Sequence, residues 1–119
     1  MDWPHLTSMN LEIASRQLEA LGNQTRLEIY RTLVRAGTGG RTVGQIQDHV
    51  GLPASTLSHH LKRLIDQRLV RQERSGTSLI CHAEYPAMTA LIGFLSDECC
   101  ADQTLTYRTG DCRKEATDG

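Results

Sequence analysis

Residues 42–70 read TVGQIQDHVGLPASTLSHHLKRLIDQRLV, and this stretch decides the fold. Thr42, followed by Gln45 three positions later, has the form of a capping box that opens a helix, and Gly51 is a typical helix stop. After a short GLP turn, apolar residues at i, i+4, i+7 and i+8 predict a second helix over 54–67. The stretch therefore predicts two short helices joined by a tight turn.

The second of these helices carries a polar face opposite its apolar stripe. A helix that fits the major groove of DNA reads base edges and phosphates with small or polar side chains near its N-terminus. Four side chains of this kind lie there, and a lysine one turn later can reach a phosphate. We therefore expect five residues of this helix to contact DNA: Ser55, Thr56, Ser58, His59 and Lys62.

The chain after this helix alternates in the manner of a β-hairpin. We expect strands over 69–73 and 78–82, with RSGT at the tip. Arg74, Gly76 and Thr77 would then contact the DNA backbone or the adjacent minor groove. A helix-turn-helix followed by a hairpin is the order of a winged helix-turn-helix, a mainly α fold with a β-hairpin wing.

Further helices are predicted over 9–21, 24–35 and from Pro86 towards residue 100. The first and last of them carry apolar stripes, formed by Leu11, Ala14, Leu18 and Leu21 and by Met88, Leu91, Ile92 and Leu95. Pairing these stripes across a two-fold axis would bury both and place two recognition helices in successive major grooves. The alternative is that the stripes close the core of a monomer.

Composition and charge narrow the class of protein. A chain of 119 residues is long enough for one domain with a single core. It has no apolar run of about 18 residues and no secretory signal, so we expect a cytoplasmic protein without a membrane partner. The net charge is −1, but residues 52–83 hold five basic and two acidic residues, a balance of +3. This basic middle can steer a polyanion to one surface.

Three segments together resemble the ArsR/SmtB family of metal-responsive transcriptional repressors. They are LGNQTRLEIYRTLV at 21–34, the stretch at 42–70, and RSGTSLICH at 74–82. The resemblance covers residues 16–100 and implies a winged-helix homodimer of order α-α-α-α-β-β-α, with the first and last helices at the interface. It also implies a repressor that binds double-stranded operator DNA and leaves it when an inducer binds.

The four cysteines refine this resemblance. Some family members sense arsenite with a Cys-x-Cys pair before the recognition helix, and this chain has none there. Others bind zinc with Asp and His on the last helix, but here Asp97 and Glu98 have no histidine beside them. The chain is instead similar to an arsenite-responsive subgroup with a vicinal cysteine pair at the end of that helix and one later cysteine. The resemblance implies a three-thiolate site of Cys99, Cys100 and Cys112.

The chemistry of thiolates agrees with this set. In a reducing cytoplasm, irregularly spaced cysteines indicate metal binding or reactivity rather than a disulfide framework. Soft thiolates select soft ions, and three sulfurs suit pyramidal As(III) or Sb(III) as the inducer. The adjacent thiols can converge if the helix ends there. We expect a domain over 1–101 and a flexible polar tail over 102–119 that supplies Cys112.

Several alternatives remain open at this point. Cys81, near the end of the second strand, could replace Cys112 as the third ligand, and a two-thiolate site would suit a monomethylated arsenical. A thiol redox or persulfide sensor of the same fold would use a cysteine pair without a metalloid. The chain shows no histidine and acid arrangement around a nucleophile, so we do not expect an enzyme.

Overall fold

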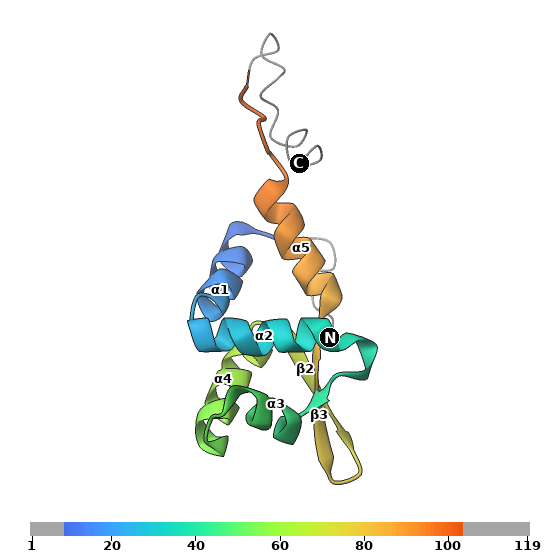
Figure 1. Cartoon of the computed structure of the whole chain (residues 1–119). Helices are drawn as coiled ribbons and strands as arrows, with labels where there is room; N and C mark the ends of the chain where they lie inside the picture. The colour runs from blue at the N-terminus through green and yellow to red at the C-terminus, as the bar shows by residue number, and fades with distance from the viewer. Residues whose placement is uncertain (1–8, 104–119) are drawn as a thin grey trace.

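The structure is a computed structural model that describes residues 9–103 (Figure 1). It contains five α-helices, a short 3₁₀ turn and three strands within that range. In chain order these are α1 (Leu11–Leu21), α2 (Gln24–Ala36), η2 (Gly37–Gly39), β1 (Arg41–Thr42), α3 (Val43–Val50), α4 (Ala54–Asp66), β2 (Val70–Ser75), β3 (Ser78–Ala83) and α5 (Tyr85–Ser96). The predicted winged helix-turn-helix is confirmed, with β1 as an addition.

Side-chain caps fix where the helices begin. The side chains of Asn10 and Asn23 accept backbone N–H hydrogen bonds at the starts of α1 and α2. Thr42 and Gln45 form the predicted capping box of α3, with hydrogen bonds of 3.0 and 2.9 Å. Gly51 ends α3 in the left-handed conformation, at φ 70°. The helix-turn-helix therefore forms where the local signals predict it.

The wing is part of a three-stranded antiparallel sheet in the order β1-β3-β2. The hairpin turns at Gly76, whose φ is 64°. The two-residue strand β1 pairs with β3, Arg41 lying opposite Cys81, and was not predicted. Gly40 precedes β1 at φ 66°, and a Cβ there would lie 2.5 Å from the Cys81 carbonyl oxygen. Only glycine lets the loop approach β3 this closely.

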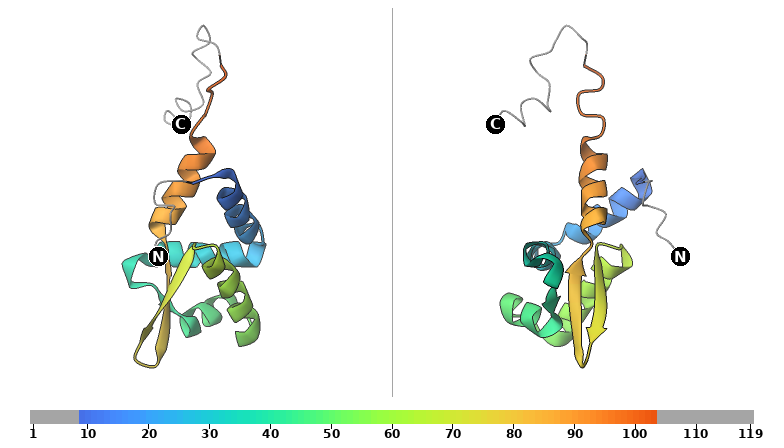
Figure 2. Two further views of the ribbon diagram at one scale, coloured as in Figure 1. Left: turned by 180° about the vertical axis from the view of Figure 1, so that it is seen from behind. Right: turned by 90° about the vertical axis from the view of Figure 1, so that its right-hand side faces the viewer.

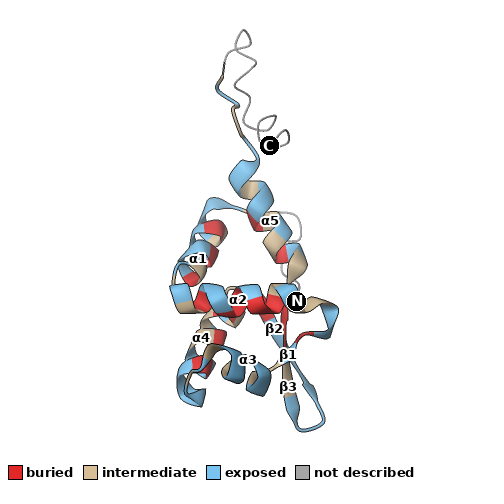
Figure 3. Cartoon of the chain, in the orientation of Figure 1, coloured by how far each residue is buried: buried red, intermediate tan, exposed pale blue. Residues whose placement is uncertain are grey.

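The core lies between α2, α3, α4 and the inner face of the sheet (Figure 3). Its fully buried side chains include Ile29, Leu33, Ile46, Leu57, Leu64 and Leu69. α1 and α5 rise from the opposite side of α2, away from α3 and the wing (Figures 1 and 2). The helix-turn-helix with its wing and the two terminal helices therefore occupy opposite ends of the molecule.

The apolar stripes of α1 and α5 are largely uncovered in one protomer. On α1, Leu11 is 74% and Leu18 40% exposed, and the buried residues are Ala14, Gln17 and Ala20. Leu11 and Leu18 of the predicted α1 stripe are therefore not covered within the chain, whereas Ala14 of the same stripe is buried. On α5, Leu91 is buried but Ile92 and Leu95 are 57% and 60% exposed. The terminal helices thus carry exposed apolar side chains.

α5 ends at Ser96 rather than near Cys100, and residues 97–103 continue as turns. The domain boundary predicted at residue 101 falls in these turns, and most of the predicted tail, including Cys112, lies outside the described residues. None of the helices described is long and apolar enough to cross a membrane.

Candidate nucleic-acid interface and cysteine pair

The recognition helix α4 is anchored on one side and exposed on the other. Leu57, Leu61 and Leu64 are buried and fix the helix against the core. The structure places all five residues of α4 predicted to contact DNA on its exposed surface, namely Ser55, Thr56, Ser58, His59 and Lys62. The three wing residues Arg74, Gly76 and Thr77 are exposed as well. Every predicted DNA contact is therefore accessible to a large ligand.

A groove of about 820 Å³ runs between α4 and the wing. Four of the predicted residues line it: Ser58, Lys62, Arg74 and Thr77. The other four are exposed without lining the groove. The structure thus brings the basic side chain of the helix and that of the wing to one concave surface.

Sequence reasoning assigned no DNA contact to five polar or small residues that also line this groove: Thr42, Gly44, Asp66, Gln72 and Ser78. Gln72 lies two positions before Arg74 on β2, so strand alternation places both on one face and could have identified it. Ser78 opens β3 beside the hairpin tip. Nothing in the sequence around Gly44 on α3 indicates that this residue lines a groove.

The charged groups of the groove differ in their partners. Lys62 Nζ lies 3.3 Å from a carboxylate oxygen of Asp66, and both side chains are exposed. Such surface pairs are weak, so Lys62 can exchange its partner for a phosphate at small cost. Arg71 on the other face of β2 is paired with Glu73 and Glu84. Within residues 9–103 Arg74 makes no ion pair, which leaves its charge available to an anion.

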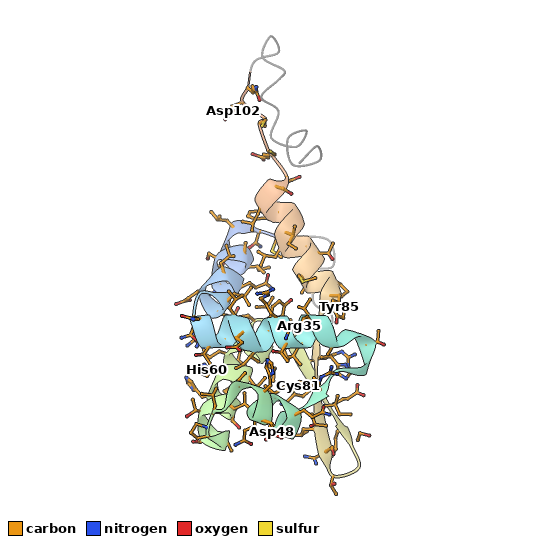
Figure 4. All side chains as sticks on the ribbon, in the orientation of Figure 1. Arg35, Asp48, His60, Cys81, Tyr85 and Asp102 are labelled. Carbon is orange, nitrogen blue, oxygen red and sulfur yellow. The ribbon has the colours of Figure 1, made fainter. Side chains whose placement is uncertain are left out.

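His60, beside the exposed His59, is half-buried and faces α2 instead of the groove (Figure 4). Its Nδ1 lies 3.3 Å from Nη1 of Arg26, a buried arginine of α2. Burial lowers the pKa of His60, and the nearby charges of Arg26, His59 and Arg63 lower it further. The imidazole is therefore neutral at physiological pH and accepts a hydrogen bond from Arg26.

Cys99 and Cys100 lie in the turns that follow α5, at the end of the molecule opposite the wing. Their sulfur atoms are 3.7 Å apart. Cys100 has a φ of 61°, a left-handed conformation that is uncommon for a residue other than glycine. A hollow of about 320 Å³ beside Cys99 is lined by Phe94, Leu95, Asp97, Glu98 and Cys99. The two sulfur atoms therefore lie side by side, and Cys99 borders this hollow.

The remaining two cysteines differ in position. Cys112 lies outside the described residues. Cys81 is fully buried in β3, where Gln72 Nε2 donates a 3.4 Å hydrogen bond to its sulfur and burial raises the pKa of its thiol. Figure 4 places Cys81 below α2, far from Asp102 at the other end of the molecule. Among residues 9–103 no three His, Cys, Asp or Glu side chains are grouped to hold a metal ion.

Comparisons with known proteins agree with this geometry. Residues 21–73 match a model of a helix-turn-helix domain. Nodulation protein NolR from Rhizobium meliloti is 36% identical over 86 residues, which cover 72% of this chain and 68% of NolR. The crystal structure of NolR from Sinorhizobium fredii is 34% identical with a TM-score of 0.59, covering 72% of this chain and 83% of that one.

NolR, at 36% identity over two thirds of its length, establishes that the relationship is one of family, and a third relative supplies the family's name. It is the homodimeric winged helix-turn-helix DNA-binding domain of a possible ArsR-family transcriptional regulator from Mycobacterium bovis. It is 27% identical, with a TM-score of 0.58, and the match covers 79% of this chain and 87% of that domain. The chain belongs to the ArsR family. As an ArsR-family transcriptional regulator, it has α3 and α4 as its helix-turn-helix and the β2–β3 hairpin as its wing.

Proposed function

We propose that this ArsR-family regulator is a metalloid-responsive repressor. It binds operator DNA as a homodimer and leaves it when As(III) or Sb(III) binds the thiolates of Cys99, Cys100 and Cys112. The observation that carries the proposal is the 3.7 Å separation of the Cys99 and Cys100 sulfurs in the turns that follow α5, the helix whose Ile92 and Leu95 are exposed.

The exposed apolar side chains support the homodimer. Leu11 and Leu18 on α1, Leu27 on α2, and Ile92 and Leu95 on α5 are the large exposed hydrophobic residues of the described chain. An apolar hollow of about 380 Å³ between α2 and α5 adjoins them, with Leu27 and Ile92 in its lining. Monomeric soluble proteins rarely expose such contiguous surface. A two-fold axis near α1 and α5 would cover it and present two copies of α4 to one face of DNA.

The groove between α4 and the wing supports DNA as the ligand. In the dimer, each α4 would enter a major groove, where Ser55, Thr56, Ser58 and His59 reach base edges. Lys62 and Arg74 would bind phosphates on either side of the groove, and Gly76 and Thr77 at the wing tip would contact the backbone. Two copies of this surface fit half-sites about one helical turn apart.

The cysteine pair supports a soft metalloid as the inducer. Thiolates prefer soft ions, and As(III) binds three sulfurs without needing nitrogen or oxygen ligands. Two sulfurs come from the turns after α5, and the third comes from Cys112. Binding would fix the end of a dimerisation helix and shift the relative orientation of the two recognition helices. A coupling of about 1–3 kcal/mol between the two sites lowers operator affinity by about 5–150-fold.

Single serine substitutions test the thiol set. Operator release by arsenite is measured by fluorescence anisotropy for Cys81→Ser, Cys99→Ser, Cys100→Ser and Cys112→Ser proteins under reducing conditions. We expect Cys81→Ser to respond like the wild type and the other three to lose the response. Arsenite release that persists when Cys99, Cys100 and Cys112 are all replaced by serine would contradict the proposal.

Two further measurements in the same experiment distinguish the proposed function from a sensor of methylated arsenicals and from a thiol redox sensor. A response of the Cys112→Ser protein to a monomethylated As(III) compound, with none to arsenite, would indicate a two-thiolate site for methylated arsenicals. Release of operator by a mild oxidant or a persulfide donor, with no response of the reduced protein to arsenite, would indicate a thiol redox sensor instead.

A further inference from the structure

α1 buries an amide where its pattern would place an apolar side chain. Gln17 is 0% exposed, and its Nε2 donates a 2.9 Å hydrogen bond to the backbone carbonyl of Gln67. Its Oε1 is buried and has no hydrogen-bond partner among the described residues. Burying an unpaired amide oxygen is unfavourable, because the oxygen gives up its hydrogen bonds to water without replacing them. The buried, partly unpaired amide of Gln17 is therefore not explained by its contribution to stability.

Gln67 is the residue that closes the recognition helix. After α4 the chain turns through Arg68 at φ 61°, with hydrogen bonds from Arg68 N to Ile65 O (2.9 Å) and from Leu69 N to Leu64 O (3.0 Å). This is the Schellman pattern, which satisfies carbonyls inside the last turn of a helix. The carbonyl oxygen of Gln67 takes no part in these two hydrogen bonds. It accepts a hydrogen bond from Nε2 of Gln17 instead. The end of α4 is therefore held by a side chain of α1.

A second buried connection joins the same two helices. The carbonyl of Ala20 on α1 accepts a 2.6 Å hydrogen bond from Nε of Arg26, and Nη1 of Arg26 is 3.3 Å from Nδ1 of His60 on α4. Arg26 is 8% exposed, so this bridge runs through the interior. Gln17 and Ala20 are three residues apart and lie on one face of α1.

α1 thus has two faces with different partners. Leu11 and Leu18 point outward on the side proposed for the second protomer, and Gln17 and Ala20 face the recognition helix. Apolar contacts tolerate sliding, but hydrogen bonds are directional and fix the relative orientation of the groups they join. α1 therefore connects the proposed dimer interface directly to α4.

We infer that Gln17 and Arg26 are positioning residues that fix the orientation of α4 against α1, and so set the separation of the two recognition helices in the dimer. The inference rests on the proposed function, because it requires a dimer that binds two half-sites. Neither residue touches DNA. Their loss should therefore change which half-site spacing the protein accepts, and not only how tightly it binds.

The test uses an operator that the wild-type full-length protein selects from a random duplex library. Affinity is measured by anisotropy for this operator and for versions with the half-sites moved by about 1 and 2 base pairs. Gln17→Met keeps the side-chain length and removes the donor, and Arg26→Lys keeps the charge but cannot bridge two acceptors. Ser15→Ala, which removes a hydrogen bond on the exposed side of α1, is the matched control.

We expect the wild type and Ser15→Ala to lose about tenfold or more in affinity when the spacing changes. Gln17→Met and Arg26→Lys should lose less than about threefold, with the dimer intact by sedimentation equilibrium. Equal spacing selectivity in both variants and the wild type would overturn the inference, as would a uniform loss of affinity at all spacings, which indicates a purely structural role. A wild type that is monomeric or selects no duplex would instead overturn the proposed function, and this inference with it.

Discussion

Nη1 of Arg26 lies 3.3 Å from Nδ1 of His60, so α2 is joined to the recognition helix through a contact that requires a neutral imidazole. The pKa of His60 is lowered from its ordinary value of 6.5, chiefly by burial and then by Arg26, His59 and Arg63. Between the lowered pKa and 6.5 the unfolded chain binds a proton that the folded chain does not. The contribution of His60 to stability is therefore complete above pH 6.5 and is lost as the pH falls towards the folded-state pKa.

Urea unfolding at several pH values tests this dependence. We expect the free energy of unfolding to fall from about pH 7.5 to about pH 5.5, and the fall to be smaller in His60→Asn. The Asn side chain can still accept a hydrogen bond from Arg26 but does not titrate. His49→Asn, at an exposed position on α3, should keep the wild-type pH profile. The same pH dependence in the His60→Asn protein would show that His60 is not its source.

Gly40 is predicted to be the glycine least tolerant of substitution around the sheet. A Cβ on Gly40 would lie 2.5 Å from the Cys81 carbonyl oxygen and 2.8 Å from the His82 ring, in a backbone conformation with φ 66°. Gly40→Ala should therefore lower the free energy of unfolding by about 2 kcal/mol or more. Gly39→Ala is the control, since a Cβ there meets nothing within 4 Å. Comparable losses of stability in the two variants would contradict the packing described for β1.

Ile92 should contribute to association more than to folding. Its side chain is 57% exposed in one protomer and lies on the apolar face of α5. Ile92→Glu should dissociate the dimer at micromolar protein concentrations and leave the helical content unchanged, because the charge would be buried only in the dimer. Sedimentation equilibrium measures the first property and circular dichroism the second. Thr38→Glu adds the same charge to the exposed turn before β1 and should remain dimeric. A dimeric Ile92→Glu protein would place the interface elsewhere.

Arg74 should contribute to the salt dependence of DNA binding. Neutralising one phosphate contact lowers the slope of log affinity against log salt concentration by about 1, so Arg74→Ala should lower it by about 1 for each wing that contacts DNA. Arg71→Ala is the matched control, because Arg71 is already paired with Glu73 and Glu84. An unchanged slope for Arg74→Ala would remove the wing from the DNA interface.

The local signals in the sequence were sufficient for most of the fold. Asn23, the Thr42–Gln45 capping box and Gly51 define helix ends through interactions between neighbouring residues, so they can be predicted without knowledge of the tertiary structure. The hairpin could be predicted for the same reason. Strand β1 could not, because two residues carry no periodicity and their pairing depends on the close approach of Gly40 to β3.

Other features were missed because they depend on contacts between distant segments. The burial of Gln17, which no pattern in α1 predicts, is accompanied by a hydrogen bond to Gln67, 50 residues away. α5 ends at Ser96, earlier than the sequence predicts, because its exposed apolar residues Ile92 and Leu95 continue the pattern without marking where the helix stops. The candidate DNA residues were easier to predict, since they lie on the exposed face opposite a regular buried stripe.

Operator binding by the reduced full-length protein in a titration with arsenite tests the central claim most directly. The affinity is followed by fluorescence anisotropy, and free thiols are counted before each measurement. The account predicts tight operator binding without arsenite and a loss of about 5–150-fold in affinity at saturating arsenite. An operator affinity that stays unchanged when arsenite is in large excess over fully reduced thiols would contradict it.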